Sequence, residues 1–185
     1  MERLPELFTE RLVLRGFQLS DAPVVQALAG AYEVAHTTLN IPHPYPANGA
    51  EEWISTHAEG IERGTDCSFA VVRREDSAVM GAIGLHIETR HNKAETGYWL
   101  GVPYWGQGYA TEALQRIIVW GFEERGLNRI YAGYFVRNPA SRRVQEKSGM
   151  QFEGIRRGDL LKNGVYEDHG MCAITRQDYL ELQKE

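Results

Sequence analysis

Cysteine is scarce in this chain, which has only Cys67 and Cys172 among its 185 residues. Two cysteines so far apart give neither a disulfide framework nor the closely spaced ligands of a zinc site. No apolar run approaches the roughly 20 residues that a membrane-spanning helix needs, and the N-terminal segment has no apolar signal core. We therefore expect a reduced, cytoplasmic protein with no metal site and no membrane segment.

Basic charge is also in short supply, since 20 lysines and arginines stand against 25 aspartates and glutamates, for a formal net charge of −5. This balance does not indicate a nucleic-acid-binding surface. The remaining composition, with 43% hydrophobic and 24% charged residues, is typical of a globular protein. A chain of this length without repeats, low-complexity tracts or a long linker predicts one domain over residues 1–185.

Hydrophobic periodicity and turn residues predict an alternation of strands and helices. Predicted strands cover residues 9–17, 68–73, 79–88, 93–101, 129–136, 151–156 and 165–173, and predicted helices cover 20–30, 50–64, 110–126, 139–149 and 175–185. Ser20 and Asp21 are expected to cap the first helix, and Asn48 with Glu51 resembles a capping box for the second. Residues 35–49 hold three prolines and predict a stiff loop. The turn at 162–164 is expected to be long.

The order of these elements predicts an α/β fold, in the sense of a mixed α+β sheet. Short polar breaks separate the three strands between residues 68 and 101, which favours an antiparallel meander. The strand–helix–strand unit from Lys93 to Val136 implies one parallel pair with a right-handed connection. We therefore expect a mostly antiparallel central sheet with one parallel pair and helices on both faces.

The segment Gly101–Leu114 is the most informative stretch, because two closely spaced glycines, Gly106 and Gly108, separate a strand from an amphipathic helix. Glycine lets backbone amides approach a ligand closely, and a helix N-terminus favours an anion, so the segment predicts a phosphate or pyrophosphate site. A nucleotide P-loop is excluded because Tyr109-Ala110 follows the second glycine. A dinucleotide fingerprint is disfavoured because its third small residue would come one place early.

The chain resembles the GNAT acetyltransferase superfamily over nearly its whole length. The resemblance rests on Gly108-Tyr109-Ala110 at the strand-to-helix junction, on 9–15 at the start, and on Asn138, Ser141 and 146–149 near the end. Trp105 stands where the family usually has arginine or glutamine, and residues 104–113 are similar to the branch of ribosomal-protein N-terminal acetyltransferases. The resemblance implies a GNAT-like acyl-CoA N-acyltransferase fold and direct transfer of acetyl from acetyl-CoA to a primary amine, with a protein N-terminal α-amine as the leading acceptor.

The same resemblance implies where acetyl-CoA binds. Backbone N–H groups are expected to hold its pyrophosphate at Gln107, Gly108, Tyr109, Ala110 and Thr111. The pantetheine arm is expected to pair, as a strand would, with the backbone at Leu100 and Val102. The N–H of Leu100 is the candidate oxyanion donor. Asn138 is expected to contact the pantetheine, and simple helix capping is an alternative that can coexist with this contact.

Two side chains are candidates for proton transfer. Strand alternation places Glu95 on one face with Trp99, and relatives often carry a glutamate here as the base; the alternatives are a solvated strand-end carboxylate, or His86 or His91 as the base. The resemblance places Ser141 near the leaving thiolate as a proton donor, and the alternative is an exposed serine of the first helical turn. Many relatives have a tyrosine four residues later, but this chain has Gln145. The proton donor to the leaving thiolate is therefore Ser141 or a water, or the thiolate leaves without one.

The acceptor site is expected to be walled by His43 and Tyr45 of the proline-rich loop and by Trp53 of the following helix. A packed surface loop is the alternative. A small amine, such as a polyamine or an aminoglycoside, is a rival acceptor, and a catalytically silent acyl-CoA-binding module is a rival function. The sequence leaves open whether the chain forms a homodimer, in which apolar residues at Ile155 and over 165–174 would pair.

Overall fold

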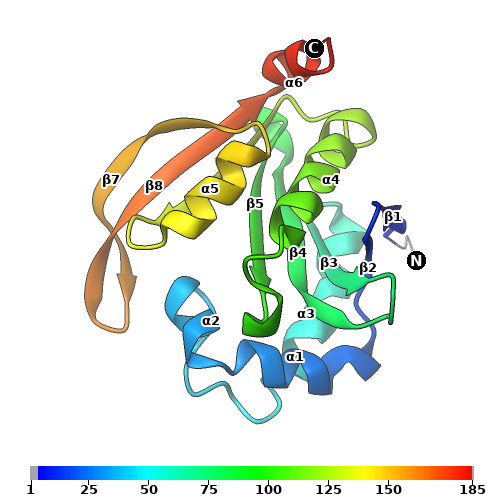
Figure 1. Ribbon diagram of the computed structural model, residues 1–185, viewed down its shortest axis with the longest axis vertical. Helices are drawn as coiled ribbons and strands as arrows, with labels where there is room; N and C mark the ends of the chain where they lie inside the picture. Colours follow the sequence, from blue (N-terminus) through cyan, green and yellow to red (C-terminus); the bar gives the residue numbers. More distant parts are fainter. Residues whose placement is uncertain (1–3, 185) are drawn as a thin grey trace.

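The computed structural model describes residues 4–184. The first three residues of the N-terminal segment, and Glu185 at the end of the predicted last helix, lie outside the described residues. Within them the chain forms one eight-stranded sheet in the order β1-β2-β3-β4-β5-β6-β8-β7 (Figure 1). The strands are β1 Leu7–Phe8, β2 Leu12–Gly16, β3 Asp66–Arg73, β4 Val79–Glu88, β5 Lys93–Leu100, β6 Arg129–Phe135, β7 Gln151–Lys162 and β8 Val165–Thr175.

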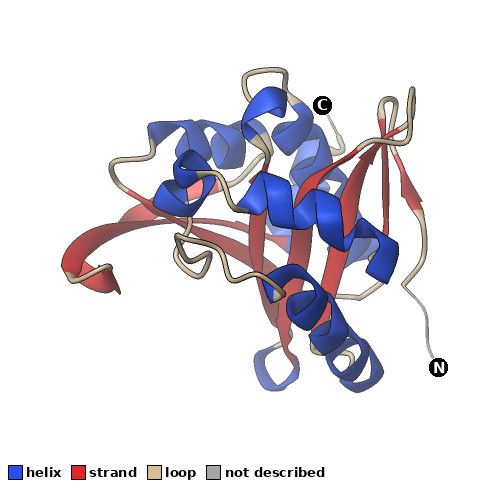
Figure 2. Ribbon diagram, turned by 90° about the horizontal axis from the view of Figure 1, so that it is seen from below, coloured by secondary structure: helices blue, strands red, loops and turns tan. Residues whose placement is uncertain are grey.

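Helices pack on both faces of this sheet (Figures 1 and 2). They are α1 Ala22–Ala29, α2 Tyr32–Thr37, α3 Gly49–Arg63, α4 Tyr109–Glu123, α5 Pro139–Lys147 and α6 Arg176–Leu182, and short 3-10 turns cover Leu19–Asp21, Thr89–His91 and Val102–Tyr104. The longest of the described helices, α3 and α4, have 15 residues each. None of the helices in residues 4–184 is both long enough and apolar enough to cross a bilayer.

Strand alternation divides the core into two layers. Phe69 and Val71 of β3 belong to the main cluster, which includes the apolar face of α4. Ala70 and Val72 point to the opposite face and form a small cluster with Val79. Phe17 packs against both this cluster and the one that α1 and α3 form around Val25. The predicted sheet with helices on both faces is therefore confirmed.

The one parallel pair, β5 with β6, is short. All other neighbouring strands are antiparallel, as expected. Parallel pairing joins Lys93 to Arg129, Ala94 to Ile130 and Glu95 to Tyr131, and then stops although both strands continue. Beyond these three pairs the two strands part. We call this opening, bounded by residues 96–100 of β5 and 132–135 of β6, the fork.

Several local expectations near the N-terminal half are corrected. The segment predicted as a loop from residue 35 begins as helix α2, which continues to Thr37. Asn48 makes no side-chain capping bond to α3; the N–H of Ala50 instead donates to Gln26 Oε1 of α1 at 3.3 Å. Asp21 does not cap α1, because its carboxylate accepts from Arg15 and from the N–H of Gln18. At α3 a glutamine of α1 thus replaces the local cap, whereas at α1 the expected capping carboxylate is engaged by groups that precede the helix.

The hairpin between β7 and β8 is tighter than expected. Lys162 pairs directly with Val165, so the turn consists of Asn163 and Gly164 alone. Both have positive φ, 50° and 80°, as a two-residue hairpin turn of the type favoured by Asn-Gly requires. The strand β7 therefore extends to Lys162, past a register shift between Arg156 and Leu160, and the two strands form a long curved arm (Figure 1).

His57 of α3 is packed without polar partners. Its ring lies edge-on to Trp53 at 4.5 Å and tilted against Phe17 at 5.4 Å. Both ring nitrogens are buried and neither has a hydrogen-bond partner. Burial lowers the pKa of His57 from 6.5 to about 4, because a charged ring would lose its hydration there.

This packing predicts an acid-sensitive contribution to stability. The unfolded chain takes up a proton at His57 below pH 6.5, whereas the folded chain does so only near pH 4. The stabilisation is thus complete above pH 6.5 and is lost as the pH falls toward 4, by about 1 kcal/mol between pH 7.5 and 5.5. Denaturant unfolding at both pH values should show this loss in the parent and not in His57→Leu. His36→Leu, at an exposed histidine, is the control; an equal loss in His57→Leu and the parent would contradict the assignment.

Candidate functional site

The glycine loop turns the chain from β5 into α4. Gly106 and Gly108 have φ of 74° and 82°, and Gly108 is the N-cap residue. A Cβ added at Gly106 would meet no atom within 4 Å, so conformation and not crowding requires glycine there. The first turn closes with Glu112 N–H donating to Gly108 O at 3.0 Å. The preceding amides, at Tyr109, Ala110 and Thr111, have no carbonyl of their own helix to bind and suit a phosphate group.

A clamp of three side chains holds the start of α4 against the N-terminal segment. Glu112 accepts from Thr9 Oγ1 at 2.6 Å and from Arg11 Nε at 2.7 Å. The Arg11 guanidinium also donates to Gln107 O at 3.0 Å and lies 4.4 Å above the Tyr109 ring. Burial of the Glu112 carboxyl is outweighed by these hydrogen bonds, which hold its pKa below the ordinary value. The loop is thereby fixed by residues roughly 100 positions away.

The fork leaves one edge of β5 open to an extended ligand. Gly101 N–H donates to Met80 O of β4 at 2.8 Å. Because N–H directions alternate along a strand, the N–H of Leu100 is directed toward the fork, as the oxyanion prediction needs. Leu100 O already accepts from Trp105 Nε1 at 2.7 Å. Val102 begins a 3-10 turn, so a ligand that pairs in strand fashion does so along β5 itself.

The first turn of α5 brings Ser141 to the fork, whereas Asn138 is not among the residues that line the cavity. Asn138 caps the helix as predicted, with Oδ1 accepting from Ser141 N at 3.3 Å. The hydroxyl of Tyr98, from β5, lies 2.9 Å from Ser141 Oγ and 3.1 Å from Ser141 O. Gln145 Nε2 lies 3.4 Å from the same Oγ. Burial raises the pKa of Tyr98 to about 12, so it is a neutral hydroxyl at ordinary pH.

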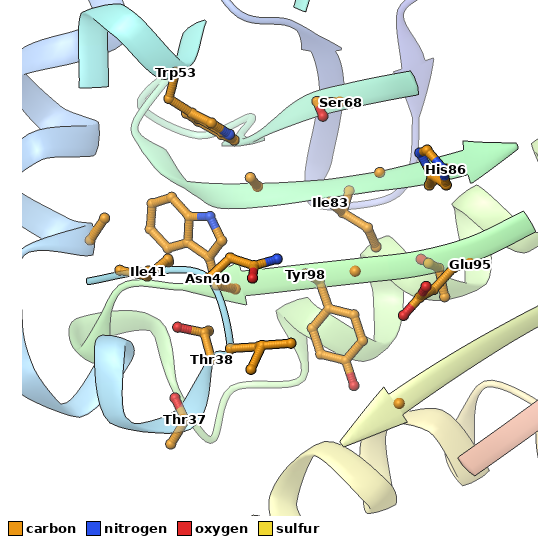
Figure 3. A pocket seen from close by; sticks show the side chains of 18 of the residues that line it. Thr37, Thr38, Asn40, Ile41, Trp53, Ser68, Ile83, His86, Glu95 and Tyr98 are labelled. Carbon is orange, nitrogen blue, oxygen red and sulfur yellow. The ribbon is translucent and has the colours of Figure 1, made fainter. Parts of the chain in front are cut away.

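A cavity of about 840 Å³ runs along the α3-covered face of the sheet and through the fork to Ser141. Glu95 and Tyr98 are directed into it from β5 (Figure 3). The face assignments predicted by strand alternation are confirmed, since Tyr98 packs in the α4 cluster and Trp99 in the α1–α3 cluster. Residues from both faces of the sheet therefore line one continuous space.

The described lining of this cavity carries carboxylates without lysine or arginine to offset them. Carboxylates of Glu52, Asp66 and Glu95 line it, and the described residues of its wall include no lysine or arginine. Asp66 Oδ1 lies 2.9 Å from His86 Nδ1, and His86 is the cross-strand neighbour of Glu95. Such a lining favours a cationic ligand.

Of the three residues expected to wall an acceptor site, Tyr45 and Trp53 line this cavity and His43 does not. The Nδ1 of His43 lies 3.2 Å from Gly30 O and its ring stands edge-on to Tyr32, so it supports the loop from outside. Of the two alternative histidine bases, His86 lines the cavity and His91 does not. Within residues 4–184, no group of three or more histidine, cysteine, aspartate or glutamate side chains is placed to hold a metal ion.

Several cavity residues escaped sequence reasoning. The segment after α2 forms one wall with Thr38 and Ile41 (Figure 3), and His169 of β8 forms another with its Nδ1 3.1 Å from Asp159 Oδ2. Lys162, almost fully buried, donates to Leu39 O at 2.9 Å and Ile41 O at 2.7 Å. Burial, with nearby Arg137, lowers the pKa of this ammonium. No pattern in the sequence predicts that these segments meet, because they lie more than a hundred residues apart.

Comparison with known proteins identifies a family. The model of the "Acetyltransferase (GNAT) domain" matches residues 11–151, well over half of the chain. A Bacillus subtilis (strain 168) protein named "Uncharacterized N-acetyltransferase YoaA" is 31% identical over 173 residues, covering 93% of this chain and 97% of the relative.

Two further similarities differ in the acceptor that their names give. The "Ribosomal-protein-serine acetyltransferase" of Escherichia coli (strain K12) is 30% identical over 113 residues, covering 60% of this chain and 62% of that protein. The crystal structure of spermidine N-acetyltransferase from Vibrio cholerae in complex with CoA and spermine superposes with a TM-score of 0.80 at 22% identity, covering 93% of this chain and 99% of that one. The second similarity is one of fold.

We expect the two hydrogen bonds of the buried Lys162 to hold the cavity wall against the β7–β8 arm. Lys162→Met keeps an unbranched apolar stem and removes the ammonium with both hydrogen bonds, so we expect the free energy of unfolding to fall by about 1–3 kcal/mol. Amide hydrogen exchange over residues 38–41 should accelerate by about tenfold or more. Lys184→Met, at an exposed lysine, serves as the control. Unchanged exchange in Lys162→Met would show that the wall is held by other contacts.

Proposed function

Because the chain belongs to the GNAT acetyltransferase family and is an acetyl-CoA-dependent N-acetyltransferase, we propose that its acceptor is the N-terminal α-amine of a protein, of the ribosomal-protein type. The observation that carries the proposal is the single cavity that joins Glu95 to Ser141 through the fork. This cavity gives an amine and a thioester access to one point from opposite faces of the sheet, as direct transfer requires.

The residues around the fork fit acetyl-CoA, which supplies the activated acetyl group. The amides of Gln107–Thr111, arranged by two positive-φ glycines, suit its pyrophosphate. The open edge of β5 suits an extended arm. Leu100 N–H is directed where it can stabilise negative charge on a carbonyl oxygen. Ser141 lines the opposite side of the fork, and Asn138 caps the helix that carries it. Binding roles for these residues are part of the proposal.

Glu95 has least to do where the acceptor loses a proton readily. Its carboxylate is exposed and lines the cavity, so it can take a proton from an amine directly or through water. An α-amine, with a pKa of about 7.7–8.0, is roughly a tenth neutral at pH 7, whereas a lysine amine near 10.4 is neutral in only about four molecules per ten thousand. Glu95 acting directly or through water is thus sufficient for an α-amine. The E. coli relative named as a ribosomal-protein-serine acetyltransferase also supports this class.

A small polyamine is the second candidate. It is favoured by the three carboxylates of the cavity, Glu52, Asp66 and Glu95, which no lysine or arginine of the described wall offsets. A single protein α-ammonium uses one carboxylate, whereas a polyamine offers a positive charge to each of them.

Thiol release from acetyl-CoA distinguishes the candidates. The acceptors are a lysine-free peptide with a free N-terminus, the same peptide with a blocked N-terminus and one internal lysine, and spermidine. We expect the free N-terminus to exceed the other two by about tenfold or more in kcat/KM at pH 7.5, because its amine is already partly neutral. The N-terminally blocked, lysine-free peptide is the control. Preference for spermidine would replace the proposal with the second candidate.

Glu95→Gln tests how much base assistance the reaction needs. With an α-amine acceptor near pH 8, where roughly half of the amine is neutral, we expect kcat to fall by less than about tenfold. The loss should grow as the pH is lowered to 6.5, since the amine is then mostly protonated. Glu88→Gln, on an exposed carboxylate outside the cavity, is the matched control. A loss of several orders of magnitude at pH 8 in a folded variant would exclude an α-amine of ordinary pKa.

A further inference from the structure

We propose that Tyr98 and Ser141 act as a two-hydroxyl relay, in which Ser141 donates a proton to the leaving sulfur and Tyr98 supplies the hydrogen bond and the proton that restore Ser141. The inference rests on the proposed binding of acetyl-CoA in the fork. It assigns a role to Tyr98, which sequence reasoning did not single out. The relay is inferred from the 2.9 Å contact between the Tyr98 hydroxyl and Ser141 Oγ.

The fold places these two hydroxyls together at the fork. Tyr98 lies three residues beyond the last parallel pair, so no β6 backbone stands beside it. Its ring packs in the cluster that faces α4, which fixes the direction of the side chain. The hydroxyl then reaches the first turn of α5 at Ser141, and both residues line the cavity (Figure 3 shows Tyr98).

Gln145 orients the serine. Its Nε2 lies 3.3 Å from Gly133 O, and because a carbonyl only accepts, the amide nitrogen and not the oxygen must face that group. The second N–H of the same amide is then available to Ser141 Oγ at 3.4 Å. The single proton of the Tyr98 hydroxyl can be donated to Ser141 O, at 3.1 Å, or to Ser141 Oγ, at 2.9 Å. When Tyr98 and Gln145 both donate to Oγ, its two lone pairs are engaged. The single hydroxyl proton of Ser141 is left free to point into the cavity.

The bonds, electron pairs and protons of the proposed acetyl-transfer step balance. As the amine nitrogen forms its bond to the acetyl carbon, the bond from that carbon to sulfur breaks, and the electron pair goes to sulfur. Sulfur takes the proton of Ser141 Oγ, Oγ takes the proton of Tyr98, and the phenolate recovers a proton from solvent in the cavity. The proton that the amine loses goes to Glu95 or to solvent, so no net proton is consumed. Tyr98 acts through Ser141 and is a positioning residue in this scheme.

Steady-state kinetics of three variants test the relay. Tyr98→Phe and Ser141→Ala should each lower kcat by roughly 10- to 100-fold with KM for acetyl-CoA within about twofold of the parent. The double variant should be no slower than the slower single variant, because the two hydroxyls act as one unit. Tyr179→Phe is the matched control, since Tyr179 is a buried tyrosine whose hydroxyl donates to Glu123 at 2.6 Å far from the cavity.

A second readout uses the complex with coenzyme A alone and needs no acceptor. A hydrogen bond donated by Ser141 to sulfur favours the thiolate, so the pKa of the bound thiol should lie below that of free coenzyme A. It should rise by about one pH unit in Tyr98→Phe and in Ser141→Ala, and stay unchanged in Tyr179→Phe. Ultraviolet titration of the thiolate measures it. Ser141→Thr, which keeps the hydroxyl, should restore the parent value.

These readouts separate the relay from the acceptor assignment. If coenzyme A binds and its thiol responds to Tyr98→Phe, the relay stands even where spermidine proves to be the acceptor. If coenzyme A binds but the thiol pKa and kcat are the same in Tyr98→Phe as in the parent, the relay is overturned. Additive losses in the double variant would also overturn it. Absence of coenzyme A binding in the folded parent would overturn both the relay and the proposed binding site.

Discussion

The separation of two parallel strands is the constraint on which the rest of the site depends. Strands β5 and β6 pair at only three positions, ending at Glu95 and Tyr131. Had the pairing continued, the open edge of β5 would be filled, and the sheet would isolate the α3 face from the α5 face. Because it stops, backbone amides of β5 remain for an extended ligand, and Glu95 and Ser141 share one cavity although they belong to opposite faces.

The opening is stable because each of its margins is held from a distance. The Thr9–Arg11–Glu112 clamp fixes the loop before α4, Trp105 ties the end of β5 to that loop through Leu100 O, and Lys162 ties the arm to the segment after α2. Hydrogen bonds of this kind contribute little net stability individually. Their joint effect is geometric, since they fasten the segments around the opening to other parts of the chain.

The cavity combines acidic side chains with a network of uncharged hydroxyl and amide groups. Its carboxylates, among them the exposed Glu95, favour an ammonium group. Such a lining suits an amine that is bound as a cation. On the thiol side, the hydroxyls of Tyr98 and Ser141 and the amide of Gln145 form an uncharged network. Proton donation there depends on hydrogen-bond direction rather than on charge.

The sequence by itself determined most of the strands and helices, the parallel pair, the glycine loop and the family, because these follow from periodicity, turn residues and motifs within short windows. It also placed Glu95 and Tyr98 on opposite faces of β5 correctly. It missed helix α2 and the short strand β1. Only the tertiary structure decided that β5 and β6 part after Glu95, that Tyr98 meets Ser141, that His43 stays outside the cavity, and that Lys162 reaches Ile41. The reason is physical: strand alternation and helix capping are local, whereas contacts between residues tens to more than a hundred positions apart are set by how whole elements pack.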